Sequence, residues 1–118
     1  MYTITKQFSF CAAHALSDLP ADHPCAAVHG HNYVVTVELS SKELNNVGFV
    51  RDYRALSIVK DYIDTRLDHK LLNAALGDLN PTAENIAKHI YDTFKKALPE
   101  LTAVEVSETP KTNARYEA

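Results

Sequence analysis

The sequence has few of the residues that mark secreted, disordered or membrane-spanning chains. Its 118 residues include two cysteines, three glycines and five prolines, and no apolar run approaches the roughly 18 residues that cross a membrane. One cysteine pair is a thin cross-link for a secreted chain, so Cys11 and Cys25 are predicted to be free thiols in a reducing compartment. Residues 1–10 alternate polar and apolar types and do not form a signal peptide. We therefore expect a soluble, cytoplasmic protein with no membrane partner.

The sequence also lacks a block of positive charge. It has 12 basic and 15 acidic side chains and a net charge of -3, without the clustered Lys and Arg that nucleic-acid binding needs. With 46% apolar residues, a chain of this length is expected to bury about two-thirds of its unfolded surface. These features predict one globular domain over residues 1–118 and no nucleic-acid partner.

Apolar residues alternate with polar ones near both ends of the chain. Even positions are apolar over most of residues 2–12, odd positions are apolar over residues 33–39, and Val104 and Val106 repeat the pattern before a turn and a return strand over 113–117. A period of two is typical of strands with one buried face. The first two strands are expected to pair antiparallel, and four strands alone leave open sheet edges.

Two amphipathic helices are predicted between these strands. Over residues 52–67, apolar residues recur at helical spacing after Asp52, which can cap the helix. Over residues 82–98, Thr82 is a good N-cap, Glu84 favours the first turn and Pro99 ends the helix. The predicted order is strand-strand-helix-helix-strand-strand, an α+β fold with two helices on one face of an antiparallel four-stranded sheet.

Three histidines are predicted to converge at one end of the sheet. His29 and His31 share the odd parity of the second strand's apolar residues, and His14 shares the even parity of the first strand's. A single histidine on an apolar face is as often a hydrogen-bonded core residue, but three together favour a metal. Three imidazoles suit Zn²⁺ with one position open to water or substrate.

Cys25 has two competing interpretations. It lies four residues before His29, so it can be the fourth ligand of a closed structural zinc site. Alternatively, its thiolate, stabilised by a nearby metal, acts as a base or nucleophile. Cys11 has the opposite parity to His14 and is expected to face the other side of the sheet, which argues against a disulfide with Cys25.

Two further polar features are candidates for a site. Asp68 precedes His69 and can fix the tautomer of an imidazole, although a charged helix end explains the same dipeptide. Glu108 has the even parity of Val104 and Val106, so its carboxylate should point to the apolar side. A ligand with two adjacent N–H groups would satisfy that carboxylate.

Several of these segments, in this order, resemble the 6-pyruvoyltetrahydropterin synthase superfamily. The resemblance runs nearly the whole length and is carried by residues 10–14, Cys25, 29–33, 48–53, 67–73, 80–85 and 108–109. It implies the tunnelling fold (T-fold), in which monomers join their sheets into a barrel and trimers stack as hexamers. The short spacer from Cys25 to His29 is similar to that of bacterial 6-carboxytetrahydropterin synthases of queuosine biosynthesis.

The resemblance also implies roles for individual residues. His14, His29 and His31 would ligate zinc, Cys25 would transfer protons, and Asp68 with His69 would complete the catalytic group. The pterin substrate would be held by Glu108 and by the start of the second long helix, at Thr82 and Glu84.

The implied reaction converts 7,8-dihydroneopterin triphosphate to 6-carboxy-5,6,7,8-tetrahydropterin with loss of triphosphate and acetaldehyde. Two alternatives remain open at this point. One is the pyruvoyl-forming synthase, which omits the carbon–carbon cleavage, and the other is a non-catalytic, zinc-stabilised oligomer that binds a pterin.

Overall fold

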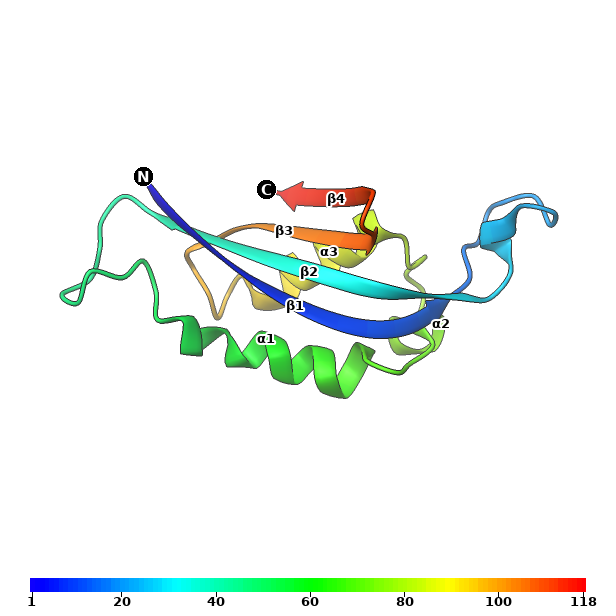
Figure 1. Ribbon diagram of the computed structural model, residues 1–118, viewed down its shortest axis with the longest axis horizontal. Helices are drawn as coiled ribbons and strands as arrows, with labels where there is room; N and C mark the ends of the chain where they lie inside the picture. Colours follow the sequence, from blue (N-terminus) through cyan, green and yellow to red (C-terminus); the bar gives the residue numbers. More distant parts are fainter.

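Two long strands organise the protein. The computed structural model describes residues 1–118 and begins with β1 (Tyr2–His14), which pairs antiparallel with β2 (His29–Ser41) along its whole length (Figure 1). The register aligns His14 with His29, so even residues of β1 share a face with odd residues of β2. The predicted parity is confirmed, and β2 starts earlier than expected because His29 and His31 lie inside the strand.

The C-terminal hairpin completes the sheet. β3 (Leu101–Thr109) pairs with β2, and β4 (Thr112–Glu117) pairs with β3, both antiparallel. The strand order is β1-β2-β3-β4, so β1 and β4 are the two edges. The predicted four-stranded antiparallel sheet is confirmed.

The first predicted helix is irregular. A 3-10 turn, η2 (Tyr53–Leu56), leads into α1 (Ser57–Tyr62), which continues as a π-helical turn, η3 (Ile63–Leu67). Asp52 caps the start by accepting the N–H of Arg54, as predicted. The expectation of one regular helix over 52–67 is wrong because the N–H of Asp68 bonds back five residues to Ile63.

The second predicted helix is shorter than expected. α3 (Ala83–Phe94) begins after Thr82, whose hydroxyl accepts the N–H of Asn85. It ends at Phe94 instead of Leu98, although Leu98 donates its N–H to the Phe94 carbonyl and stays buried. A short helix that the sequence pattern does not predict, α2 (Leu72–Ala75), lies beside the end of β1 (Figure 1).

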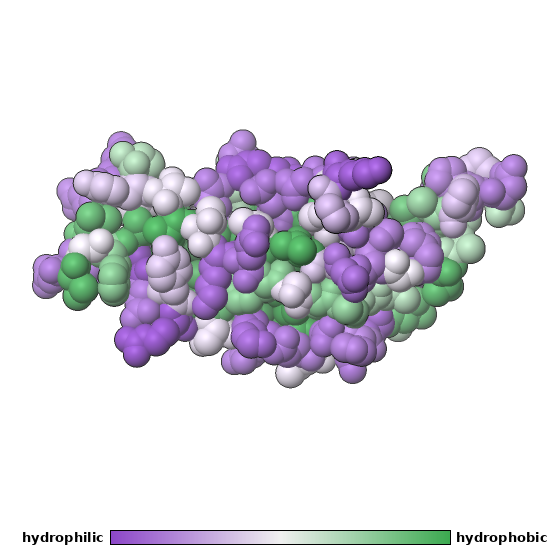
Figure 2. All heavy atoms as spheres, viewed as in Figure 1, coloured by the Kyte–Doolittle hydropathy of each residue, from purple (hydrophilic) through white to green (hydrophobic).

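One hydrophobic core lies between the helices and the sheet. It contains 21 buried residues from β1, β2, β3 and the helical segments, while the other face of the sheet is mostly polar. Figure 2 shows hydrophilic residues over much of the surface, with apolar residues visible in the seam between the sheet and α1. None of the helices combines the length and the apolar character needed to cross a membrane.

Candidate metal centre and active site

Three histidine side chains meet where β1 ends and β2 begins. The ligand atoms of His14, His29 and His31 lie within 4.8 Å of one another. His14 is fully buried, and the other two are partly buried. The antiparallel register produces this cluster. His14 is paired with His29, and His31, paired with Ala12, lies two residues further along β2 with its side chain on the same face. The convergence predicted from parity is confirmed.

Two backbone carbonyls fix the tautomers of His14 and His29. Nδ1 of His14 lies 2.7 Å from the Pro81 carbonyl oxygen, and Nδ1 of His29 lies 2.7 Å from the Ala27 carbonyl oxygen. A carbonyl only accepts, so each Nδ1 donates and each neutral ring presents a lone pair at Nε2. These two Nε2 atoms are 3.0 Å apart. Facing lone pairs at this distance repel unless a cation is shared between them.

The remaining properties of the cluster also fit a metal. Burial lowers the pKa of His14, which favours the neutral ring that a metal requires. Nε2 of His31 is buried without a hydrogen-bond partner. The hydroxyl of Tyr33 lies 3.1 Å from Nδ1 of His14, and burial raises the pKa of this phenol. Three imidazoles grouped in this way suit a divalent transition metal.

Glu108 brings a carboxylate to the same end of the sheet. Its Oε2 lies 3.6 Å from Nε2 of His31, and no Lys or Arg pairs with it. A cavity of about 510 Å³ lies here, lined in part by His31, Asn32, Ser107 and Glu108. The expected orientation of Glu108 is confirmed, and its oxygens remain available to accept hydrogen bonds from a ligand.

Asp68 and His69 form a pair on the outer edge of β1. Oδ2 of Asp68 lies 2.9 Å from Nδ1 of His69, and Oδ1 accepts the N–H of Cys11 at 2.9 Å. The Cys11 N–H and the His69 side chain lower the pKa of Asp68. His69 has a left-handed backbone with φ of 59° and an 81% exposed side chain. The pair is therefore held by the strand that carries His14.

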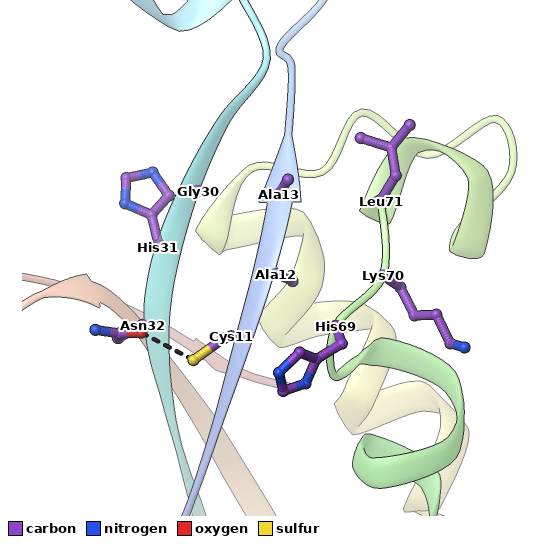
Figure 3. Close-up of a pocket in the computed structure, with 9 residues that line it drawn as sticks. All are labelled: Cys11, Ala12, Ala13, Gly30, His31, Asn32, His69, Lys70 and Leu71. Carbon is purple, nitrogen blue, oxygen red and sulfur yellow. Dashed lines mark hydrogen bonds between the residues drawn. The ribbon is translucent and has the colours of Figure 1, made fainter.

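One residue of this pair and one of the three clustered histidines line the same cavity. His31 and His69 both line an open cavity of about 530 Å³, with Cys11, Asn32 and Lys70 (Figure 3). No hydrogen bond joins Asp68 or His69 to the three clustered histidines. Figure 3 also shows the thiol of Cys11 donating to the side-chain oxygen of Asn32, and Cys11 is exposed, as its parity predicts.

Cys25 lies in the loop that joins β1 to β2. It is part of a 3-10 turn, η1 (Pro24–Ala26), and its thiol is free and partly buried. Its N–H donates to Nδ1 of His23, and its carbonyl accepts the N–H of Leu16. The clustered ligand atoms are those of the three histidines, without Cys25.

The start of α3 touches the site through its backbone. Pro81, just before the helix, supplies the carbonyl that holds His14, and Thr82 caps the helix. Glu84 is exposed in the first turn and forms no ion pair. Two groups at the site were not predicted from the sequence. The Pro81 carbonyl is a backbone group, which no side-chain pattern can indicate. The Tyr33 hydroxyl could have been predicted, because Tyr33 has the same odd parity in β2 as His31.

Comparison with known proteins gives a consistent result. The chain is 38% identical to the "6-carboxy-5,6,7,8-tetrahydropterin synthase" of Synechocystis sp., an alignment that covers 98% of this chain and 93% of the relative. It is 36% identical to the "dihydroneopterin monophosphate aldolase" of Pyrococcus furiosus over 81% of this chain and 77% of that protein. Both relatives carry the names of pterin enzymes.

The fold comparison agrees with the sequence comparison. The structure of Caenorhabditis elegans 6-pyruvoyl tetrahydropterin synthase superposes with a TM-score of 0.87 and 27% identity, covering 99% of this chain and 95% of that chain. The predicted T-fold is thereby confirmed for the single chain. Residues 3–118 match the 6-pyruvoyl tetrahydropterin synthase family, and the chain belongs to this family.

Proposed function

We propose that the protein is a 6-carboxy-5,6,7,8-tetrahydropterin synthase. The observation that carries the proposal is the convergence of three imidazoles beside the carboxylate of Glu108, with which no Lys or Arg pairs. The 38% identity to a synthase of this name over nearly the whole chain supports the choice of reaction. The substrate is 7,8-dihydroneopterin triphosphate, which takes up water and gives 6-carboxytetrahydropterin, acetaldehyde and triphosphate.

The metal held by His14, His29 and His31 is zinc in this proposal. A bound zinc ion would act as a Lewis acid on the side-chain oxygens of the substrate and acidify the neighbouring C–H bonds. The Pro81 and Ala27 carbonyls orient two of the ligands, as outer partners of metal-binding histidines commonly do.

The remaining residues bind the pterin or move protons. Glu108 accepts hydrogen bonds from the amide and amino N–H groups of the ring, which are stronger for an ionised acceptor. Cys25 serves as the proton-transfer thiol, and Asp68 with His69 forms the second acid–base group. Thr82 and Glu84 lie at the helix start nearest the site and contribute to pterin binding.

The setting of the reaction is also part of the proposal. The protein is a single T-fold domain over residues 1–118 that assembles as a homohexamer of two trimers in the cytoplasm. Its product enters queuosine biosynthesis. Both cysteines are free thiols, which agrees with a reducing compartment.

One alternative is the pyruvoyl-forming synthase, because the C. elegans enzyme of that name has the same fold at 27% identity. It would eliminate triphosphate and shift the redox state of the side chain without breaking a carbon–carbon bond. The short spacer between Cys25 and His29, similar to that of carboxy-forming enzymes, favours the first proposal.

Product analysis tests the proposal. The zinc-loaded protein is incubated with 7,8-dihydroneopterin triphosphate, the pterin product is identified by mass, and acetaldehyde is trapped as a hydrazone. A carboxylated pterin with equimolar acetaldehyde supports the proposal. A pyruvoyl pterin without acetaldehyde establishes the alternative, and bound but unchanged substrate indicates a binding protein. His29→Ala is the matched control without an intact metal site.

A further inference from the structure

The segment after η3 covers the outer edge of β1 near the three clustered histidines. The N–H of Cys11 donates to Asp68, and its carbonyl accepts the N–H of His69 at 2.6 Å. The N–H of Ala13 donates to the carbonyl of Lys70 at 3.1 Å. Figure 3 shows this segment running along β1. Odd residues of β1 therefore direct their backbone groups outward, toward the segment after η3.

Two asparagine side chains continue this pairing beyond the end of β1. The amide of Asn73 accepts the N–H of Ala15 at 2.9 Å and donates to the Ala15 carbonyl at 2.7 Å. The amide of Asn80 accepts the N–H of Ser17 at 3.0 Å and donates to the Ser17 carbonyl at 3.4 Å. Each amide acts as a neighbouring strand would, satisfying both backbone groups of one residue. We call these two asparagines the edge clasp.

Leu16, between Ala15 and Ser17, is hydrogen-bonded to the turn that contains Cys25. Leu16 donates its N–H to the carbonyl of Cys25 at 2.9 Å. Ala15, immediately before it, follows the metal-ligating His14 directly. The clasp therefore fixes the backbone on both sides of the hydrogen bond that ties Cys25 to the strand carrying His14.

We propose that Asn73 is a positioning residue that, with Asn80, sets Cys25 relative to the three histidines. The inference rests on the proposed catalytic role of Cys25. Asn73 reaches no clustered histidine, so it acts through Ala15 and Leu16. His14 has its own support in the pairing of β1 with β2 and in the Pro81 carbonyl, so the metal site does not depend on the clasp.

The test compares Asn73→Ala and Asn73→Asp with the native zinc-loaded protein. Iodoacetamide labelling, followed by peptide mass analysis, gives the rates for Cys25 and Cys11 in one sample. Alanine loses both hydrogen bonds between Asn73 and Ala15. Aspartate has nearly the same shape, but it cannot donate and places an anionic oxygen against the Ala15 carbonyl. Asn45→Ala is the matched control, because Asn45 also holds loop backbone. Its loop, between β2 and α1, lies at the opposite end of the molecule (Figure 1).

We expect both Asn73 variants to keep their zinc and to label Cys25 about tenfold faster, since alanine removes both hydrogen bonds to Ala15 and aspartate replaces the donated one by repulsion. In the same variants kcat should fall roughly 10- to 100-fold with little change in KM, the loss expected for a misplaced catalytic group. The labelling rate of Cys11 in these variants should stay near its native value. In Asn45→Ala, both labelling rates and kcat should stay near native values. If Asn73→Ala does not fold, Asn80→Ala tests the clasp at its outer end.

Three results would overturn the inference. The first is a folded Asn73 variant with native labelling of Cys25. The second is full activity in Asn73→Asp, because it would show that the donated bond is unnecessary. The third is loss of zinc together with activity, since that indicates a general structural role. The labelling rate requires no turnover, so it separates failure of the clasp from failure of the proposed reaction.

Discussion

His14 and His29 each donate a hydrogen bond from one ring nitrogen to a backbone carbonyl, so the other ring nitrogen of each carries a lone pair. With Nδ1 of each ring donating, the two Nε2 lone pairs face each other at 3.0 Å. A hydrogen-bonded core histidine would need a donor opposite each lone pair, and none is present. The geometry is that of a ligand set, and a metal would replace repulsion between the lone pairs by attraction to a common ion.

Replacing Cys25 by alanine separates a catalytic thiol from a zinc ligand. The three histidines cluster without Cys25, so Cys25→Ala should fold and retain about one metal per chain. Its turnover should fall roughly 10²-fold or more, as for loss of a proton-transfer group. Metal content by atomic emission and the steady-state rate are measured on the same sample.

His29→Ala is the control for this prediction, because it removes a ligand and should lose the metal. Loss of zinc and thermal stability together in Cys25→Ala would instead show that Cys25 completes a closed site. Substantial turnover by zinc-replete Cys25→Ala would remove Cys25 from the catalytic group.

Replacing Glu108 by glutamine tests pterin recognition with almost no change in shape. The substitution exchanges one acceptor oxygen for an N–H donor, which would face the N–H groups of the ring and leave donors unpaired. We expect substrate affinity to fall by about 10- to 100-fold, the loss associated with unpaired groups of this kind. Calorimetry with the pterin product measures it, and Glu43→Gln is a matched control at an exposed position in the loop after β2. Unchanged affinity in Glu108→Gln would exclude the residue from the site.

At the scale of secondary structure elements, the strands were the best predicted and the helix ends the worst. A period of two assigned His14, His29 and His31 to one face because each has the parity of its strand's apolar residues, and a one-residue slip of the register would expose that apolar set. The π turn of η3 was not predicted, since apolar residues four apart, such as Ile63 and Leu67, fit an α-helix equally well. The edge clasp escaped prediction because Asn73 bonds to backbone groups 58 residues away, and backbone groups carry no sequence signal.

The two main helical segments are joined by a polar contact that should make stability depend on pH. Nε2 of His89 on α3 lies 2.6 Å from the hydroxyl of Tyr62 on α1, and burial lowers the pKa of His89. The unfolded chain, with a histidine pKa of about 6.5, therefore takes up this proton first as the pH falls. Stability should decrease as the pH drops through about 6.5 toward the folded-state pKa.

His89→Gln removes this titration while keeping a polar partner for Tyr62. We expect the free energy of unfolding of the variant to fall less steeply than that of the native protein between about pH 7 and 5. Urea unfolding at a series of pH values, with both proteins zinc-saturated, measures the two slopes, and the other histidines contribute equally to both. Parallel curves would show that His89 is not the group responsible.

At the scale of the whole molecule, the fold exposes two sheet edges. The clasp and the segment after η3 cover β1 only near its end, and its outer edge from Thr3 to Ser9 has no partner strand. The outer edge of β4 is likewise uncovered. Open edges favour pairing with another strand, and the exposed side chain of His69, paired with Asp68, lies on the β1 edge. We therefore expect copies of the chain to join edge to edge, as the proposed hexamer requires.

A proline at Gln7 tests this expectation. Gln7 has the parity of Cys11, whose backbone groups point outward, so its N–H is expected to face away from β2. Proline removes this donor, and edge strands tolerate that change better than central ones. Gln7→Pro should therefore fold and bind zinc but sediment as a smaller species than the native protein at micromolar concentration. Lys6→Pro is the contrasting variant, because it removes a bond to β2 and should destabilise the chain itself. A native protein that sediments as a monomer, or a Gln7→Pro variant that assembles like the native protein, would show that this edge does not mediate assembly.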